Sequence, residues 1–222
     1  MLEILFEDEW LVAVSKPAGQ VVHPTYKNVS GTLVDELRAR DPERTFSPVG
    51  RLDKLTSGVV VVAKSGPVHA GLQRIWPSAE KDYLAVVNGW VEPARGEITL
   101  PLGTDPADRR RRIVRPDGAR SVTQYERIAG DGHCCILRCR PVTGRRHQIR
   151  VHLAACGWPV LGDAVYGPPG DARFHRHALH ASRLVLAHPI TAASLRIEAR
   201  VPDDLASLMT ARGLRLTSQL QL

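Results

Sequence analysis

The chain has 222 residues, enough to bury a core without disulfides or a structural metal, and 30 Lys and Arg residues against 23 Asp and Glu residues give it a net charge of +7. No apolar run approaches the roughly 18 residues of a membrane-spanning helix, and the first residues, MLEILFEDEW, carry acids where a secretory signal is basic and apolar. We therefore expect a cytoplasmic protein without a membrane span, and the excess of cations favours a polyanionic partner such as nucleic acid.

In the first third of the chain, the hydrophobic pattern predicts strands and two helices. Two short strands precede the turn KPAG, and GTLVDELRARD at 31–41 supplies an amphipathic helix. SGVVVVAKS, at 57–65, is too short and too rich in β-branched residues to be a helix, which predicts a strand buried on both faces. A helix that begins at Pro67 is expected to cover this strand.

The rest of the chain has a pattern typical of β-hairpins, because short apolar segments follow one another with Gly, Pro and Asp between them. Strands are expected at 81–91, 96–103, 109–116, 119–129, 133–144, 177–189 and 194–202. A helix is expected from Gly144 to Gly157 with Ile149, Leu153 and Cys156 inward, and a closing helix ends at Gly213. The prediction is one α+β domain over 1–222, a central mixed, mainly antiparallel β-sheet flanked by helices and loops, with a frayed tail at 214–222.

The four cysteines, Cys134, Cys135, Cys139 and Cys156, form no C-x-x-C pair. Adjacent residues on a strand point to opposite faces, so Cys134 and Cys135 do not suit a common ligand. We interpret all four as reduced thiols of the core.

A lone carboxylate, Asp53, lies in GRLDKLTSG, the loop before the buried strand. A surface ion pair is the ordinary explanation for an acid between Arg51 and Lys54. Asp53, however, precedes a buried strand and is followed by small residues. A carboxylate that guanidinium donors keep ionised becomes an oriented nucleophile or base, which favours a catalytic role.

Three other features suit nucleic acid. In RPVTGRRHQIRVHLA, a Thr-Gly turn that leads into a helix is surrounded by Arg140, Arg145, Arg146 and Arg150, a placement that suits phosphate. The run DRRRRIVRP contains Arg109 and Arg110 and favours contact with a nucleic-acid backbone over a merely solvated hairpin edge. Tyr83, on an otherwise aliphatic strand, is either core packing or a platform for an extruded base.

Taken in order, GRLDKLTSGVVVVAKS, KDYLAVVNG, TGRRHQIRVHLAACGWPVLGDAVYG and HALHASRLVLAHPIT resemble the RluA-type RNA pseudouridine synthases. The resemblance extends from about Ile4 to Leu208. It implies an isomerase that flips a uridine out of structured RNA, tRNA or ribosomal RNA, breaks its N-glycosidic bond and joins C5 to C1′ without cofactor or metal. It further implies a catalytic domain with no appended RNA-binding module, and we expect a monomer.

The resemblance also implies roles for single residues. Asp53 matches the catalytic aspartate, Tyr83 the base-stacking tyrosine, and Arg145 the arginine that pairs with the aspartate. Arg51 matches the arginine that fills the space of the flipped nucleotide, and Ile149 a hydrophobic residue that packs near the tyrosine. Three routes are open to the aspartate: addition to C1′, addition to C6, or removal of the 2′ proton.

Two positions depart from the family pattern, and both affect the expected RNA contacts. Gly50 stands where most members have His, as in the related RsuA-type synthases, and Arg146 replaces a small polar residue. A non-catalytic RNA-binding protein on the same scaffold is the alternative, but the intact Asp53, Tyr83 and Arg145 argue against it. A metal-dependent hydrolase that uses the histidines of FHRHALH is disfavoured, because the pattern completes no ligand shell.

Overall fold

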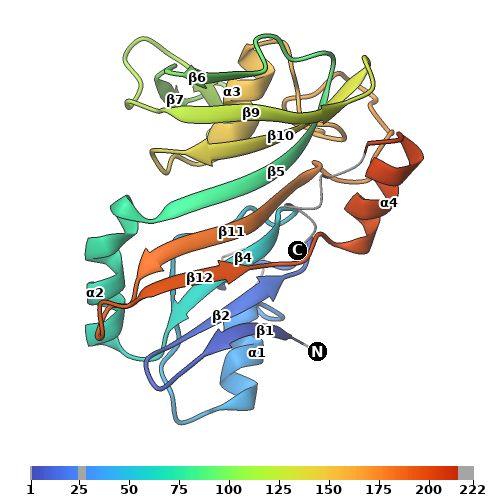
Figure 1. The fold of residues 1–222 in the computed structure, drawn as a ribbon. Coiled ribbons are helices and arrows are strands. Elements are labelled where there is room, and N and C mark those ends of the chain that lie inside the picture. Colours follow the sequence, from blue (N-terminus) through green and yellow to red (C-terminus); the bar gives the residue numbers. More distant parts are fainter. Residues whose placement is uncertain (1, 25–28, 215–222) are drawn as a thin grey trace. The chain divides into compact units, whose positions relative to one another are not determined.

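The computed structural model describes residues 2–24 and 29–214, which divide into two compact units (Figure 1). Unit 1 comprises Met1–Lys81 and Ala181–Val201, and unit 2 comprises Asp82–His180 and Pro202–Leu222. The boundaries fall inside β5 (Glu80–Asn88) and β11 (Leu179–Ala187), so each of these strands gives residues to both units. The single domain that we expect over 1–222 stays a prediction. Of its expected frayed tail only Leu214, which is buried, is among the described residues.

Unit 1 is built on a sheet in which β2 lies between β1 and β4, and β11 follows β4. β1–β2, β2–β4, β3–β4 and β11–β12 are antiparallel pairs. The remaining elements of this unit are β1 (Glu3–Glu7), β2 (Leu11–Lys16), α1 (Leu33–Arg40), β3 (Ser47–Val49), β4 (Ser57–Ala63), α2 (Gly66–Ile75), a 3₁₀ turn (Trp76–Ser78) and β12 (Ser194–Glu198).

The valine run forms the centre of unit 1, because all seven residues of β4 are buried. Val60 packs with Leu33 of α1, and Val61 packs with Leu72 of α2. Alternate valines therefore face different helices, which confirms the strand buried on both faces. Each such side chain stabilises the fold by roughly 1.5–3 kcal/mol relative to an exposed one.

Unit 2 is built on the antiparallel order β5–β10–β9–β6, with a separate hairpin of β7 and β8. In Figure 1, α3 lies behind β9 and β10. The elements are β6 (Arg95–Ile98), β7 (Leu102–Thr104), β8 (Arg112–Val114), β9 (Thr123–Gly130), β10 (Cys134–Pro141), α3 (Gln148–Ala155) and α4 (Asp203–Ala211). These elements confirm the predicted α+β fold with a mainly antiparallel sheet.

α3 begins later than the sequence predicts. We expected it from Gly144, but the helix starts at Gln148, because residues 144–147 form a turn that ends with His147 at φ 57°. Ile149 and Leu153 are buried as predicted, whereas Cys156 is half-buried just after the last turn.

The described residues contain no helix long and apolar enough to cross a membrane. Among those same residues, no three His, Cys, Asp or Glu side chains gather in a group that could hold a metal ion. The cysteines within them are all free thiols, and Cys134, Cys135 and Cys139 are buried.

Candidate active site

In unit 1, Asp53 lies half-buried in the loop between β3 and β4. Its backbone carbonyl accepts a hydrogen bond from Thr56 N–H at 3.0 Å, which closes a turn directly before β4. The next carbonyl, that of Lys54, accepts Gly19 N–H at 2.8 Å. The candidate catalytic loop is thus fixed to the KPAG turn through its backbone.

A buried cation, Lys16, strengthens this attachment. Its side chain is 0% exposed, and Nζ donates to the carbonyl oxygens of Pro17 at 2.7 Å, Gln20 at 2.9 Å and Lys54 at 3.2 Å. An ammonium has three N–H groups, so these carbonyls satisfy each of them. Our sequence reasoning missed Lys16, although a lysine that ends an apolar strand just before a proline is a readable signal.

The structure explains why position 50 is a glycine. Its φ is +71°, and a β-carbon at this position would lie 2.6 Å from Cζ2 and 2.9 Å from Cε2 of Trp76. A left-handed backbone and an indole this close to the position of a β-carbon disfavour a larger side chain. The indole of Trp76 therefore accounts for glycine at this position, where the sequence resemblance leads us to expect His, and Arg51, the next residue, is exposed.

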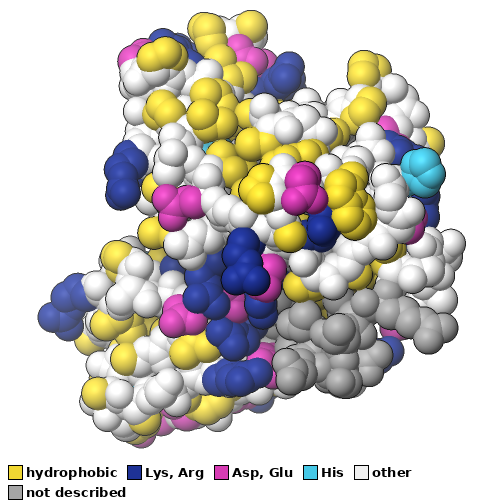
Figure 2. Space-filling view, turned by 45° about the horizontal axis from the view of Figure 1, so that its top comes forward, with side chains coloured by type: hydrophobic (Ala, Val, Ile, Leu, Met, Phe, Trp, Pro, Cys, Tyr) yellow, Lys and Arg dark blue, Asp and Glu magenta, His cyan; other side chains and the backbone are white. Residues whose placement is uncertain are grey.

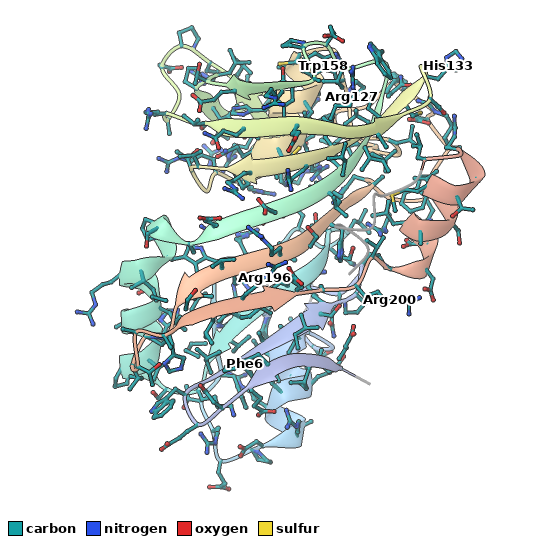
Figure 3. All side chains as sticks on the ribbon, in the orientation of Figure 1. Phe6, Arg127, His133, Trp158, Arg196 and Arg200 are labelled. Carbon is teal, nitrogen blue, oxygen red and sulfur yellow. The ribbon has the colours of Figure 1, made fainter. Side chains whose placement is uncertain are left out.

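In unit 2, the strand register gives the face on which Tyr83 lies. Tyr83 is directly opposite Cys139 of β10, which is opposite Tyr125 of β9. Directly opposed residues share one face of a sheet. The ring of Tyr125 lies edge-on to the ring of Trp158, with ring centroids 5.4 Å apart. Trp158, which Figure 3 labels, follows α3 in the chain. Tyr83 therefore lies on the face that α3 covers.

Arg145 precedes α3 on the same side of this sheet, in the turn of residues 143–148. Its N–H donates to Oε1 of Gln148 at 3.0 Å, and its carbonyl accepts Gln148 N–H at 3.2 Å. Its Nε donates to the carbonyl of Arg120 at 3.4 Å, and the side chain is exposed. The backbone of Arg145 is thus fixed while its guanidinium faces outward.

The neighbours of Arg145 are less exposed. Ile149 is buried, and Nε of Arg146 donates to Nε2 of His147 at 3.3 Å. Arg150 is 4% exposed and donates to both oxygens of Asp163, at 2.7 and 2.9 Å. Burial raises the pKa of Asp163, but the hydrogen bonds and charge of Arg150 outweigh it and lower that pKa overall. The burial of Arg150 favours a structural role over the RNA contact predicted from the sequence.

The arginine-rich loop joins β7 to β8. Arg109 and Arg110 are exposed, and Nε of Arg110 donates to Asp108 at 2.9 Å. Hydrogen bonds from Arg110 lower the pKa of Asp108 to about 2, so this carboxylate stays ionised. Figure 2 shows similar mixing on the face it displays, where dark-blue Lys and Arg side chains lie next to magenta Asp and Glu side chains.

Tyr166 connects this hairpin to the Arg145 turn. Its hydroxyl oxygen accepts Arg112 N–H of β8 at 2.9 Å and lies 2.7 Å from Nδ1 of His147. Because Arg146 donates to Nε2 of His147, Nδ1 carries the proton and donates to Tyr166. The guanidinium carbons of Arg111 and Arg150 lie 5.9 and 5.1 Å from the Tyr166 ring centroid.

Comparison with known proteins identifies the family. A family model described as RNA pseudouridylate synthase matches residues 10–155, more than half of the chain. The ribosomal large subunit pseudouridine synthase D of Xanthomonas campestris pv. campestris is 40% identical over 229 residues, which cover 95% of this chain and 69% of the relative. The chain belongs to the RluA-type RNA pseudouridine synthases. An uncharacterized RNA pseudouridine synthase of Bacillus subtilis, YlyB, is 37% identical over 217 residues, covering 94% of this synthase and 72% of the relative.

Solved structures agree on the fold. Human RNA pseudouridylate synthase domain containing 1 has a TM-score of 0.77 at 26% identity, covering 91% of this synthase and 84% of that chain. Human RNA pseudouridylate synthase domain containing 4 has a TM-score of 0.78 over 97% of this synthase and 95% of that chain, and at 22% identity it supports the fold alone.

This synthase therefore isomerises uridine in RNA to pseudouridine. The reaction breaks the bond between N1 and C1′, forms one between C5 and C1′, and moves a proton from C5 to solvent while N1 gains one, so that no atom is lost overall. A stacked uracil offers neither C1′ nor C6 to a side chain, so the base must first leave the stack. The site needs an ionised group at the sugar or base, an aromatic surface for the flipped base, and cations for the backbone.

Proposed function

We propose that Asp53 is the catalytic carboxylate of this synthase. Its loop is anchored by Lys16, which supports a carboxylate held in one orientation, and Asp53 lies within the segment that the family model matches. This anchored loop is the observation that carries the proposal. Addition to C1′, addition to C6 and removal of the 2′ proton all begin from an ionised carboxylate, a form that a neighbouring cation favours.

Tyr83 and Arg145 complete the proposed catalytic set. Tyr83 stacks on the flipped uracil, and its place on the α3 face of unit 2, the side from which Arg145 is presented, supports this role. Arg145 keeps Asp53 ionised and aligned, because a guanidinium donates two parallel hydrogen bonds to a carboxylate. Its exposed guanidinium on a fixed backbone suits that task.

The proposed RNA contacts come from four cations, of which Arg51, Arg109 and Arg110 are exposed, and from one apolar side chain. Arg51 fills the space that the flipped nucleotide leaves, and Ile149 packs near Tyr83. Arg109, Arg110 and Arg146 contact the backbone. The name ribosomal large subunit pseudouridine synthase, carried by a relative 40% identical, supports ribosomal RNA as the substrate in preference to tRNA. A cytoplasmic monomer is part of the same proposal.

Asp53→Asn tests the catalytic assignment. We expect the variant to lose pseudouridine formation, because an amide is neither a base nor a nucleophile here, while the dissociation constant for RNA changes less than about threefold. Since isomerisation frees the hydrogen of C5, tritium release from RNA that contains 5-tritiated uridine measures the reaction. Asp41→Asn, at the end of α1, is the matched control and should keep wild-type activity. Activity that persists in Asp53→Asn would refute the assignment.

The substrate is tested separately by mapping pseudouridines in total RNA from cells with and without the gene. We expect a site to disappear from large-subunit ribosomal RNA. Loss confined to tRNA would overturn the ribosomal proposal and leave the role of Asp53 intact.

A further inference from the structure

Gln148, the first residue of α3, uses the whole hydrogen-bonding capacity of its amide while 4% exposed. Oε1 accepts the hydroxyl of Thr143 at 2.7 Å and N–H of Arg145 at 3.0 Å. Nε2 donates to the carbonyl of Val122 and to Oγ1 of Thr123, both at 2.9 Å. A side-chain amide offers two donors and two acceptor positions, so none is left over for a substrate.

The partners of Gln148 are themselves held in one orientation. Nε2 of His152 donates to the carbonyl of Leu100 at 2.9 Å, because a carbonyl only accepts. Nδ1 of His152 therefore accepts from the hydroxyl of Thr123 at 2.9 Å, and Oγ1 of Thr123 accepts from Gln148. The hydrogen bonds from Gln148 through Thr123 and His152 to Leu100 therefore all donate in the same direction. This order excludes a flipped Gln148 amide, in which Nε2 and Oε1 would exchange places.

The opposite end of the network is equally fixed. The hydroxyl of Thr143 accepts Val122 N–H at 2.9 Å and donates to Gln148. The turn between Thr143 and Gln148 is therefore attached at both ends to the start of β9. It also contains His147 in the left-handed region, a conformation that a non-glycine residue keeps only when its surroundings enforce it.

Arg145 lies at the middle of this arrangement, because both of its backbone hydrogen-bonding groups bind residue 148. We propose that Gln148 is a positioning residue that orients Arg145 for catalysis while touching neither RNA nor Asp53. The inference rests on the catalytic role of Arg145 proposed above. A displacement of about 1 Å in a catalytic group can lower a rate by about 100-fold, so loosening this turn should slow the chemical step.

Gln148→Met tests the inference, because methionine has a similar length and keeps none of the four hydrogen bonds. Single-turnover tritium release with enzyme in excess over RNA isolates the chemical step from RNA binding. We expect the rate to fall at least about tenfold while the dissociation constant for RNA changes less than about threefold. Gln124→Met is the matched control, because it makes the same chemical change on the exposed side chain of the residue next to Thr123 and should keep the wild-type rate.

A double-mutant cycle with Arg145→Ala separates positioning through Arg145 from a general loss of structure. Once Arg145 is truncated, adding Gln148→Met should change the rate less than about twofold. Multiplicative losses in the double variant, or a wild-type rate in Gln148→Met, would overturn the inference. A wild-type rate in Arg145→Ala would instead refute the role of Arg145 on which the inference rests.

Thermal unfolding of each variant shows whether it folds. If Gln148→Met does not fold, the same cycle is run with Gln148→Glu, which keeps the side-chain size and an acceptor oxygen for Thr143 and Arg145 but loses the amide donors to Val122 and Thr123. For Gln148→Glu we expect the same loss of rate as for Gln148→Met and the same lack of additivity with Arg145→Ala. The results that would overturn the inference are therefore also the same.

Discussion

At the scale of single residues, Lys16 is the clearest case of a buried polar side chain that finds hydrogen-bond partners. Desolvating an ammonium costs several kcal/mol, which hydrogen bonds to the charged group must offset. The carbonyls of Pro17, Gln20 and Lys54 supply those bonds, and they lose a charged donor when the cation is removed. Removing the cation would therefore cost stability at both ends of the interaction.

Lys16→Met should lower the free energy of unfolding by at least about 2 kcal/mol, because carbonyl groups lose a charged donor in a buried place. Urea denaturation followed by circular dichroism measures the change. Arg74→Met, an exposed cation of α2, is the control and should stay within about 0.5 kcal/mol of wild type. Equal stabilities of the two variants would contradict this account of Lys16.

The thiols should differ in reactivity, because burial raises the pKa of Cys139 to about 12 whereas Cys156 is only half-buried. The thiolate is the reactive form. Iodoacetamide at pH 8.5 is expected to modify Cys156 in the folded synthase and Cys139 only after unfolding, as peptide mass spectrometry would show. Early labelling of Cys139 would be inconsistent with its burial.

At the scale of elements, α3 is held by polar contacts more than by its own capping. Its N-cap residue, His147, makes no side-chain capping bond, and its helical residues include the buried Gln148, Arg150 and His152. Each binds a group outside the helix: Gln148 binds the start of β9, Arg150 binds Asp163, and His152 binds Leu100. The stability of α3 should therefore depend on the protonation of His152 and of Asp163, the partner of Arg150.

Burial lowers the pKa of His152 and outweighs the opposing effect of its hydrogen bond to Leu100. A histidine with a lowered folded pKa stabilises the fold fully above its unfolded pKa of about 6.5, and this contribution is lost as the pH falls through the folded value. We expect the free-energy difference between wild type and His152→Gln to shrink between pH 7.5 and pH 5 in urea titrations. A difference independent of pH would show that His152 does not titrate with folding.

At the scale of the whole molecule, not all of the 30 Lys and Arg residues are available to RNA. Arg150, Arg173 and Arg176 each bind an aspartate, and Arg150 and Arg176 are also buried. RNA binding that releases counterions depends on the cations that reach phosphate and not on the net charge. The exposed arginines of the β7–β8 loop are candidates for such contacts.

Arg109→Ala combined with Arg110→Ala should weaken RNA binding and reduce the slope of log K against log salt by about 1 to 2, since each phosphate contact contributes about 0.7 to 0.9. Fluorescence anisotropy over a range of KCl concentrations measures the slope. Arg196→Ala on β12 of unit 1, labelled in Figure 3, is the control and should leave it unchanged. An unaltered slope in the double variant would remove this loop from the RNA footprint.

Local patterns predicted the elements well. The run Val59–Val62 is β-branched and lies between turn residues, so it reads as a buried strand without knowledge of its neighbours. Asp53 and Arg145 were found through motifs whose residues lie close together in the sequence. Whatever depends on a short stretch of chain could therefore be read from it, including the candidate catalytic residues.

Contacts between distant segments could not be predicted in this way. The buried place of Gln148 depends on its bonds to Val122 and Thr123, at the start of β9 and far from Gln148 in the sequence. A glutamine in an amphipathic helix otherwise looks like a surface residue. The close approach of Trp76 to Gly50 likewise depends on how the 3₁₀ turn after α2 packs. The division into two units cannot be read from the sequence, because its boundaries fall inside the continuous strands β5 and β11.

The three carbonyls around Lys16 form, in effect, a cation site whose ion is covalently attached to the chain. A free ion would exchange with the medium, whereas a tethered one is always present at a high effective concentration. Added salt competes for phosphate contacts at the surface but has no access to a fully buried ammonium. High salt should therefore dissociate RNA from this synthase without changing the conformation of the Asp53 loop.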